Sequence, residues 1–323
     1  MMEKQFHVPI MKNEVINLLA PERGGVYVDG TVGGAGHGRP IAQQLSKNDL
    51  LVGVDLDPEA LRVSEKELSN VEPRIKLVQG DFKNLPRILS CEGVDELDGC
   101  LLDLGVSSYQ LDTPERGFSY RYPEAPLDMR MNPDNPLTAA DIVNSWSKRD
   151  IATVLRKYGE ERWASRIASF IKRRRNKKTI QTCGELVEVI KSAIPAAARR
   201  RGGHPARRTF QALRIAVNDE LQGFEKALES IIHELNPGGR MVVISFHSLE
   251  DRRVKKVFRR LSQICHCPPD FPVCRCDGAT VEKLNGGLMR PTEKEIEQNR
   301  RASAAKLRAI RRLECKEESN DTV

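Results

Sequence analysis

Four short apolar runs dominate the first third of the chain, each with a glycine or an aspartate close to its end. They cover residues 26–30, 50–55, 75–79 and 100–104, and stretches of helical length separate them. Short apolar runs bounded by turn residues are typical of buried strands. Strands that alternate with helices form parallel sheets covered by helices. The sequence therefore predicts an α/β domain.

The strand pattern stops after the fourth run and returns at residues 241–246. Five prolines between residues 114 and 136 argue against strands in that part of the chain. The economical interpretation is one α/β domain with an insertion of ordinary domain size. We expect residues 1–112 and 209–323 to form the discontinuous α/β domain, and residues 113–208 to form the insertion.

The expected insertion has the apolar spacing of helices from residue 139 to residue 195. One long helix is expected to follow, from about residue 209 to residue 235. The apolar residues expected to form the helical core are Ile142, Trp146, Ile151, Leu155, Trp163, Ile167 and Phe170.

Basic residues concentrate in the insertion. Residues 148–208 hold 18 lysines and arginines against 5 acidic residues, whereas the whole chain has a net charge of +7. Cations that neutralise phosphates release counterions, so such a segment favours a nucleic-acid partner, although a solvated helix face is the alternative. The candidate nucleic-acid contacts are Arg130, Arg173, Arg174, Arg175, Arg207, Arg208 and His247. For His247, a general-base role and a purely structural role are the alternatives.

No apolar run approaches the roughly 18 residues that a membrane span needs, and the first residues lack the apolar core of a signal peptide. We therefore expect a cytoplasmic protein with reduced thiols and no membrane partner.

Four cysteines lie close together near the C-terminus: Cys265, Cys267, Cys274 and Cys276. They could hold zinc, but Cys-x-Cys pairs are less usual than the two-residue spacing of zinc knuckles. Reduced thiols in a proline-rich loop are the alternative, and we expect no metal.

A glycine-rich turn follows the first expected strand, at residues 29–38. Glycines permit positive φ and close approach of a ligand, and the start of the next helix offers free amide donors. Asp55 ends the second strand, where a carboxylate can accept hydrogen bonds from ribose hydroxyls. The turn lacks the Gly-x-Gly-x-x-Gly register of nicotinamide sites and the Gly-Lys-Ser/Thr of a P-loop.

Polar or aromatic residues also follow the third and fourth strands, at Asp81, Phe82 and Asp103. Ligands of open α/β sheets bind at these carboxyl ends. A nucleoside would use Phe82 as an apolar wall, Asp55 for its diol and the backbone of residues 33–36 for close approach. Taken singly, a core phenylalanine, a helix cap at Asp81 and a turn carboxylate at Asp103 are the alternatives.

Six further motifs occur in order along the chain. They are DLGVSS at 103–108, RGFS at 116–119, PLDMRM at 126–131, YGEER at 158–162, RTFQALR at 208–214 and SFHSLEDR at 245–252. With the glycine-rich turn and Asp55, they make the chain resemble the bacterial small-subunit rRNA cytosine-N4 methyltransferase family, also called MraW. This family belongs to the class I S-adenosylmethionine-dependent methyltransferases.

The resemblance implies a Rossmann-like class I methyltransferase sheet with an inserted all-helical domain. It also implies methylation of the exocyclic N4 of one cytidine in the decoding centre of small-subunit (16S) rRNA. The partner would be that rRNA or the assembling small subunit, with no obligate protein partner. The residues expected to bind S-adenosylmethionine are Gly33, Gly34, Ala35, Gly36, His37, Asp55, Phe82, Asp103 and Gln110.

Methyl transfer from a sulfonium needs in-line attack, so the main contribution of the protein is alignment. Cytosine N4 delocalises its lone pair into the ring, and acceptors for its N–H hydrogens therefore help it to react. We expect Asp103, Ser107 and Ser108 to supply them. The alternative functions are a non-catalytic RNA-binding assembly factor and a nicotinamide-dependent oxidoreductase, which the missing dinucleotide fingerprint disfavours.

Overall fold

The computed structural model describes residues 9–200, 203–265, 267 and 278–314. The chain divides into two compact units, Met1–Gly105 with Gly223–Val323, and Val106–Gln222. These boundaries differ from the predicted ones at 112/113 and 208/209. Helix α11 (Arg207–Asn218) packs against α7 (Lys148–Gly159), which places it in the second unit.

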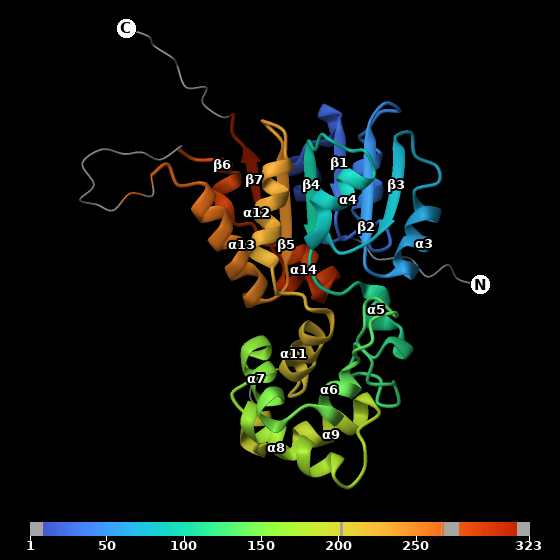
Figure 1. Ribbon diagram of the computed structural model, residues 1–323, viewed down its shortest axis with the longest axis vertical. Helices are drawn as coiled ribbons and strands as arrows, with labels where there is room; N and C mark the ends of the chain where they lie inside the picture. Colours follow the sequence, from blue (N-terminus) through green and yellow to red (C-terminus); the bar gives the residue numbers. More distant parts are fainter. Residues whose placement is uncertain (1–8, 201–202, 266, 268–277, 315–323) are drawn as a thin grey trace. The chain divides into compact units, whose positions relative to one another are not determined.

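A seven-stranded sheet forms the centre of the first unit (Figure 1). Its strands are β1 (Val26–Asp29), β2 (Leu50–Asp55), β3 (Arg74–Gln79), β4 (Gly99–Asp103), β5 (Arg240–Ser245), β6 (Val281–Lys283) and β7 (Lys306–Arg312). They lie in the order β3-β2-β1-β4-β5-β7-β6. The Rossmann-like α/β fold expected from the sequence is thereby confirmed. The strand order reverses direction between β1 and β4, where ligands of such sheets bind.

The sheet is mixed rather than wholly parallel. Strands β1 to β5 run parallel, but β7 pairs antiparallel with both β5 and β6. The last two strands were not predicted because arginines interrupt the apolar pattern of β7.

Successive side chains of the inner strands enter two apolar cores, as the pleat of a strand requires. Val28 and Leu102 lie in a core on one face, and Tyr27 and Leu101 lie in a core on the other. Helices therefore cover both faces, which explains why these strands are continuously apolar. The helices of this unit are α1 (Lys12–Leu19), α2 (Gly38–Ala42), α3 (Pro58–Glu67), α4 (Leu85–Cys91), α12 (Phe224–Glu234), α13 (Ser248–Leu261) and α14 (Glu293–Gln298).

The second unit is helical. Its helices are α5 (Ser108–Asp112), α6 (Ala139–Ser145), α7, α8 (Ala164–Arg175), α9 (Cys183–Ala193), α10 (Ala196–Arg199) and α11. Four of the predicted core residues, Ile142, Ile151, Leu155 and Ile167, are fully buried, whereas Trp146, Trp163 and Phe170 are only partly buried. Within the described ranges, no helix combines the length and apolarity needed to cross a bilayer.

The single helix predicted from about residue 209 to 235 is wrong. The chain instead forms α11 and α12, separated by a turn. Asp219 ends α11 in the left-handed conformation with φ 50°, and Gly223 precedes α12 with φ 71°. An aspartate tolerates this conformation at a helix end, so the break carries little sequence signal.

Candidate active site

The glycine-rich turn follows β1 and lies in close contact with β4. The Gly30 amide donates to the Leu101 carbonyl oxygen at 2.9 Å. A Cβ atom added at Gly30 would lie 2.6 Å from a methyl carbon of Leu102. Further along the turn, Gly33 and Ala35 are both left-handed, with φ 53° and 59°. This conformation costs a non-glycine residue about 1–2 kcal/mol, so the surrounding contacts must hold Ala35 in place.

Asp55 holds this turn from the end of β2. One carboxylate oxygen accepts the Gly33 amide at 2.8 Å, and the other accepts the Asp57 amide at 2.9 Å. Burial raises the pKa of Asp55 to about 6, although the two amide hydrogen bonds oppose the shift. Each carboxylate oxygen can accept a second hydrogen bond, so the side chain still has room for a ribose diol.

Asp103 ends β4 on the other side of the strand-order reversal. Its amide donates to Thr31 Oγ1 at 2.7 Å, and its Oδ2 lies 3.6 Å from Nε2 of the buried His37. Its Oδ1 is buried and has no hydrogen-bond partner among the residues that the structure describes. Such an oxygen is a place where a ligand's donor fits, because buried polar atoms normally have partners.

The carboxyl groups of Asp29, Asp55 and Asp103 lie at this sheet edge. Their surroundings favour either a bound proton or a nearby cation. Burial raises the pKa of Asp103 to about 8, with smaller contributions from the charges of Asp29 and Glu250. Burial likewise raises the pKa of Asp29, which is 1% exposed, to about 7. With Asp55 nearby, the negative charges oppose one another, and a positively charged ligand relieves that repulsion. Asp29 and Thr31 were not predicted as site residues, because their roles depend on contacts between strands.

The turn after β3 supplies an aromatic wall. Asp81 caps the short 3-10 helix Phe82–Asn84 by accepting the Lys83 amide at 2.9 Å, as its structural alternative predicted. Phe82 is half-buried and packs edge-to-face on Phe224, with ring centroids 5.9 Å apart. The ring is thus anchored by the core while it stays partly accessible at the sheet edge.

Ser107, Ser108 and Gln110 lie in the second unit, at the start of α5. Ser107 Oγ accepts the Gln110 amide, and Gln110 Oε1 accepts the Ser107 amide, both at 3.1 Å. This reciprocal capping box fixes the first turn of the helix. Catalysis by the serines and cofactor binding by Gln110 stay predictions.

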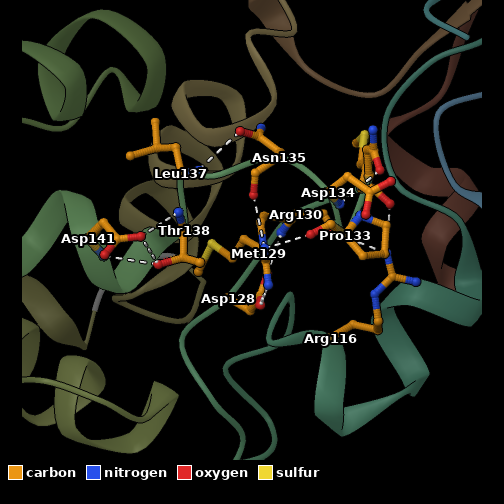
Figure 2. Close-up of polar contacts among 12 residues, drawn as sticks. Arg116, Asp128, Met129, Arg130, Pro133, Asp134, Asn135, Leu137, Thr138 and Asp141 are labelled. Atoms are coloured by element: carbon orange, nitrogen blue, oxygen red, sulfur yellow. Dashed lines mark hydrogen bonds and ion pairs between the residues drawn. The ribbon is translucent and has the colours of Figure 1, made fainter.

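Arg130 braces a loop of the second unit (Figure 2). Its guanidinium forms a two-pronged ion pair with Asp128 at 2.9 and 2.8 Å and donates to the carbonyl oxygens of Pro133 and Asn135. The Asp128 contact raises the pKa of Arg130. Met129, between the paired residues, is buried and left-handed with φ 68°. Contact of Arg130 with RNA stays a prediction beside this internal role.

The basic runs contain both engaged and exposed cations. Arg174 approaches Glu185 at 3.4 Å, and Arg175 donates to the Val143 carbonyl oxygen at 2.9 Å. Arg208 donates to the Glu160 carbonyl oxygen at 3.2 Å. Three of these candidates are exposed: Arg173, whose guanidinium lies 4.0 Å from the Phe170 ring centroid, Arg207 and Arg208.

His247 caps the start of α13. Its Nδ1 accepts the Glu250 amide at 3.3 Å, and Glu250 Oε2 accepts the His247 amide at 3.2 Å. The structural role is therefore present, and contact with RNA stays a prediction. Of the clustered cysteines, Cys265 and Cys267 lie close together, with the Cys267 amide 3.4 Å from Cys265 Sγ, whereas Cys274 and Cys276 lie outside the described residues.

Comparison with known proteins covers nearly the whole chain. The sequence model of the MraW methylase family matches residues 4–313. A protein of Symbiobacterium thermophilum named ribosomal RNA small subunit methyltransferase H is 50% identical over 314 residues, covering 97% of this chain and 98% of that protein. Its namesake from Geobacter sulfurreducens is 52% identical over 308 residues, covering 95% and 99%. A third, from Heliobacterium modesticaldum, is 50% identical over 309 residues, covering 95% and 98%.

Proposed function

We propose that this chain, which belongs to the MraW methylase family and is an S-adenosylmethionine-dependent rRNA methyltransferase, methylates the exocyclic N4 of one cytidine in the decoding centre of small-subunit rRNA. The observation that carries the proposal is the carboxylate of Asp103. It lies at the reversal of strand order, has a raised pKa and keeps one buried oxygen without a partner in the described chain.

The residues of the first unit fit the cofactor. Asp55 would hold the ribose hydroxyls, Phe82 would line the adenine, and the backbone of residues 33–37 would allow close approach. When bound, S-adenosylmethionine supplies an activated methyl group on a positively charged sulfur. The carboxylates of Asp29, Asp55 and Asp103 make this sheet edge favourable for that charge.

Asp103 would act as the proton acceptor. An N–H hydrogen of cytosine N4 donated to Asp103 Oδ1 would favour a pyramidal nitrogen with an available lone pair. Once ionised, a carboxylate with a pKa near 8 is a stronger base than an ordinary aspartate and so accepts the proton more readily. Ser107 and Ser108 would offer further acceptors, and His37 would position the Asp103 carboxylate from 3.6 Å.

The helical insertion would hold the RNA. Exposed cations such as Arg173 and Arg207 suit phosphates, and phosphate contacts position a protein without reading sequence. The target base would be unstacked into the site, as for other enzymes that modify bases. The substrate would be small-subunit rRNA or the assembling subunit, and the protein would act in the cytoplasm.

The decisive experiment is mass spectrometry of small-subunit rRNA nucleosides from cells with and without the gene. We expect N4-methylated cytidine to disappear with the gene, and to return with the wild-type gene but not with Asp103→Asn. Unchanged N4-methylated cytidine in the deletion strain would exclude the proposed target. Full rescue of both growth and modification by Asp103→Asn would exclude the role of Asp103. Rescue of growth without the modified base would favour a non-catalytic assembly factor.

A further inference from the structure

Helix α13 of the first unit is strongly amphipathic, and neither the site nor the insertion accounts for its charge. Val254, Val257 and Phe258 are buried against the core. The opposite surface carries six cations on a helix of 14 residues: Arg252, Arg253, Lys255, Lys256, Arg259 and Arg260. A buried stripe of this kind fixes which flank of the helix each cation occupies.

One flank of α13 is already neutralised by the neighbouring helix α12. Lys256 Nζ lies 2.7 Å from a Glu225 carboxylate oxygen, and Arg260 pairs with Glu229 one turn further along. The two helices lie side by side on the sheet (Figure 1), so the paired residues form a short ladder along their seam. These cations face acidic partners within the protein.

Lys255 and Arg259 occupy the other flank. Both are exposed, and neither of their charged side-chain groups forms an ion pair or a hydrogen bond with any described residue. They stand four residues apart, so their side chains are neighbours on one face of the helix. Like charges at this spacing repel each other, and a bound anion removes the repulsion.

We propose that Lys255 and Arg259 form a second RNA-binding face, carried by the methyltransferase unit itself, that contacts phosphates of the rRNA backbone. The inference rests on the proposed function for the identity of the RNA. Two adjacent cations suit consecutive phosphates of one strand, since each neutralised phosphate releases counterions. Contacts of this kind give affinity and register but no sequence preference. This face would bind RNA on the unit that contains Asp103, in addition to the RNA contacts proposed for the helical insertion.

A matched pair of double variants tests the proposal. Lys255→Gln/Arg259→Gln removes two cations that face solvent, whereas Lys256→Gln/Arg260→Gln removes two from the same helix that face Glu225 and Glu229. The full-length proteins would be titrated with transcribed small-subunit rRNA over a range of salt concentrations. We expect the first variant to reduce the slope of log affinity against log salt by about 1.5, since each phosphate contributes roughly 0.7–0.9.

We expect the control variant to change the slope by less than half as much. Circular dichroism melts would show that both variants remain folded. Equal slope changes in the two variants would mean that the charge acts at long range, and no change in either would mean that α13 does not contact RNA. Both results overturn the proposal, and so does an absence of RNA binding by the wild type.

Methylation kinetics separate this inference from the proposed function. The first variant should raise KM for the rRNA several-fold and leave kcat within twofold, because its residues lie outside the catalytic machinery. If the wild type methylates cytidine N4 and the variant keeps the wild-type KM and slope, the face is refuted while the function stands. If the wild type leaves N4 unmodified but the slopes differ as expected, the function fails and the RNA-binding face stands.

Discussion

His37 Nε2 lies 3.6 Å from Asp103 Oδ2, so the end of the glycine-rich turn and the end of β4 face each other across the reversal of strand order. The contact joins a buried imidazole to a carboxyl group whose pKa is raised to about 8. This arrangement suits a site that accepts a proton near neutral pH.

Asp103→Asn should lower kcat by about 10²–10⁴-fold, the usual contribution of a positioned base. The asparagine keeps the shape of the side chain but cannot take up the proton. Methyl transfer to small-subunit rRNA under saturating cofactor is the measurement. Asp81→Asn, which alters a helix cap on the same unit, should leave kcat within a few-fold. A wild-type kcat for Asp103→Asn would show that the proton goes elsewhere.

The kcat/KM of the wild type should rise about tenfold per pH unit up to about pH 8 and then level off, because Asp103 accepts a proton only when ionised. The profile of kcat/KM reports the free enzyme, to which the raised pKa applies. Rates measured from pH 6 to 9 would reveal the rise, and Asp103→Asn should lose it. A profile without this limb in the wild type would contradict the assignment.

Asp29→Asn should stabilise the ligand-free protein at high pH. In the fold, the pKa of Asp29 is raised from 3.8 to about 7, so the native state binds the proton more tightly than the unfolded state. Its contribution is favourable below pH 4 and is lost as the pH rises through 7. The asparagine avoids this loss, which is worth about 4 kcal/mol. Thermal melts should show a higher Tm for the variant at pH 9 and a negligible difference at pH 4.

Gly30→Ala should destabilise the first unit by about 1–3 kcal/mol, the usual cost of overpacking a core. The added Cβ would meet Leu102 at 2.6 Å and Phe82 at 3.3 Å. Displacement of the turn should also weaken binding of S-adenosylhomocysteine. Gly203→Ala is the control, because a Cβ at Gly203 would meet nothing within 4 Å. Urea unfolding and calorimetry would test both effects, and equal stabilities of the two variants would count against the tight turn.

Arg130→Lys separates an internal role from a phosphate contact. Lysine keeps the charge but cannot form the two-pronged pair with Asp128. We expect faster amide hydrogen exchange over residues 128–138 and an unchanged salt dependence of RNA binding. Arg130→Gln should lower the salt slope by about 0.7–0.9 only if the guanidinium also neutralises a phosphate. Wild-type exchange rates in Arg130→Lys would show that the loop does not depend on the two-pronged ion pair between Arg130 and Asp128.

The sequence located β1 to β5 to within one or two residues, because each contains a short apolar run bounded by turn residues, although β3 at the sheet edge is only partly buried. It failed at β7, where Arg308 and Arg311 interrupt the pattern. Arg308 binds Asp251 at 2.8 Å, and Arg311 binds Glu282 at 2.7 Å. These partners are distant in sequence, and no local pattern reveals such pairing.

The placement of three candidate site residues after strand ends was predictable from the sequence. Asp55, Phe82 and Asp103 all lie at carboxyl ends of strands, as the spacing predicted. Asp55 also has a structural role, because its carboxylate accepts hydrogen bonds from the Gly33 and Asp57 amides. This role is visible only in the folded chain. The same holds for Thr31, which follows β1. Its hydroxyl oxygen accepts a hydrogen bond from the amide of Asp103 at the end of β4.

That hydroxyl has a practical consequence for inhibitor design. Because Thr31 Oγ1 accepts a hydrogen bond from the amide of Asp103, the last residue of β4, this contact opposes separation of the two walls by a bulkier compound. Substituents directed between them must break this hydrogen bond, whereas those directed towards the half-buried ring of Phe82 meet a partly exposed aromatic surface. Selective compounds against this chain should therefore grow from the aromatic side.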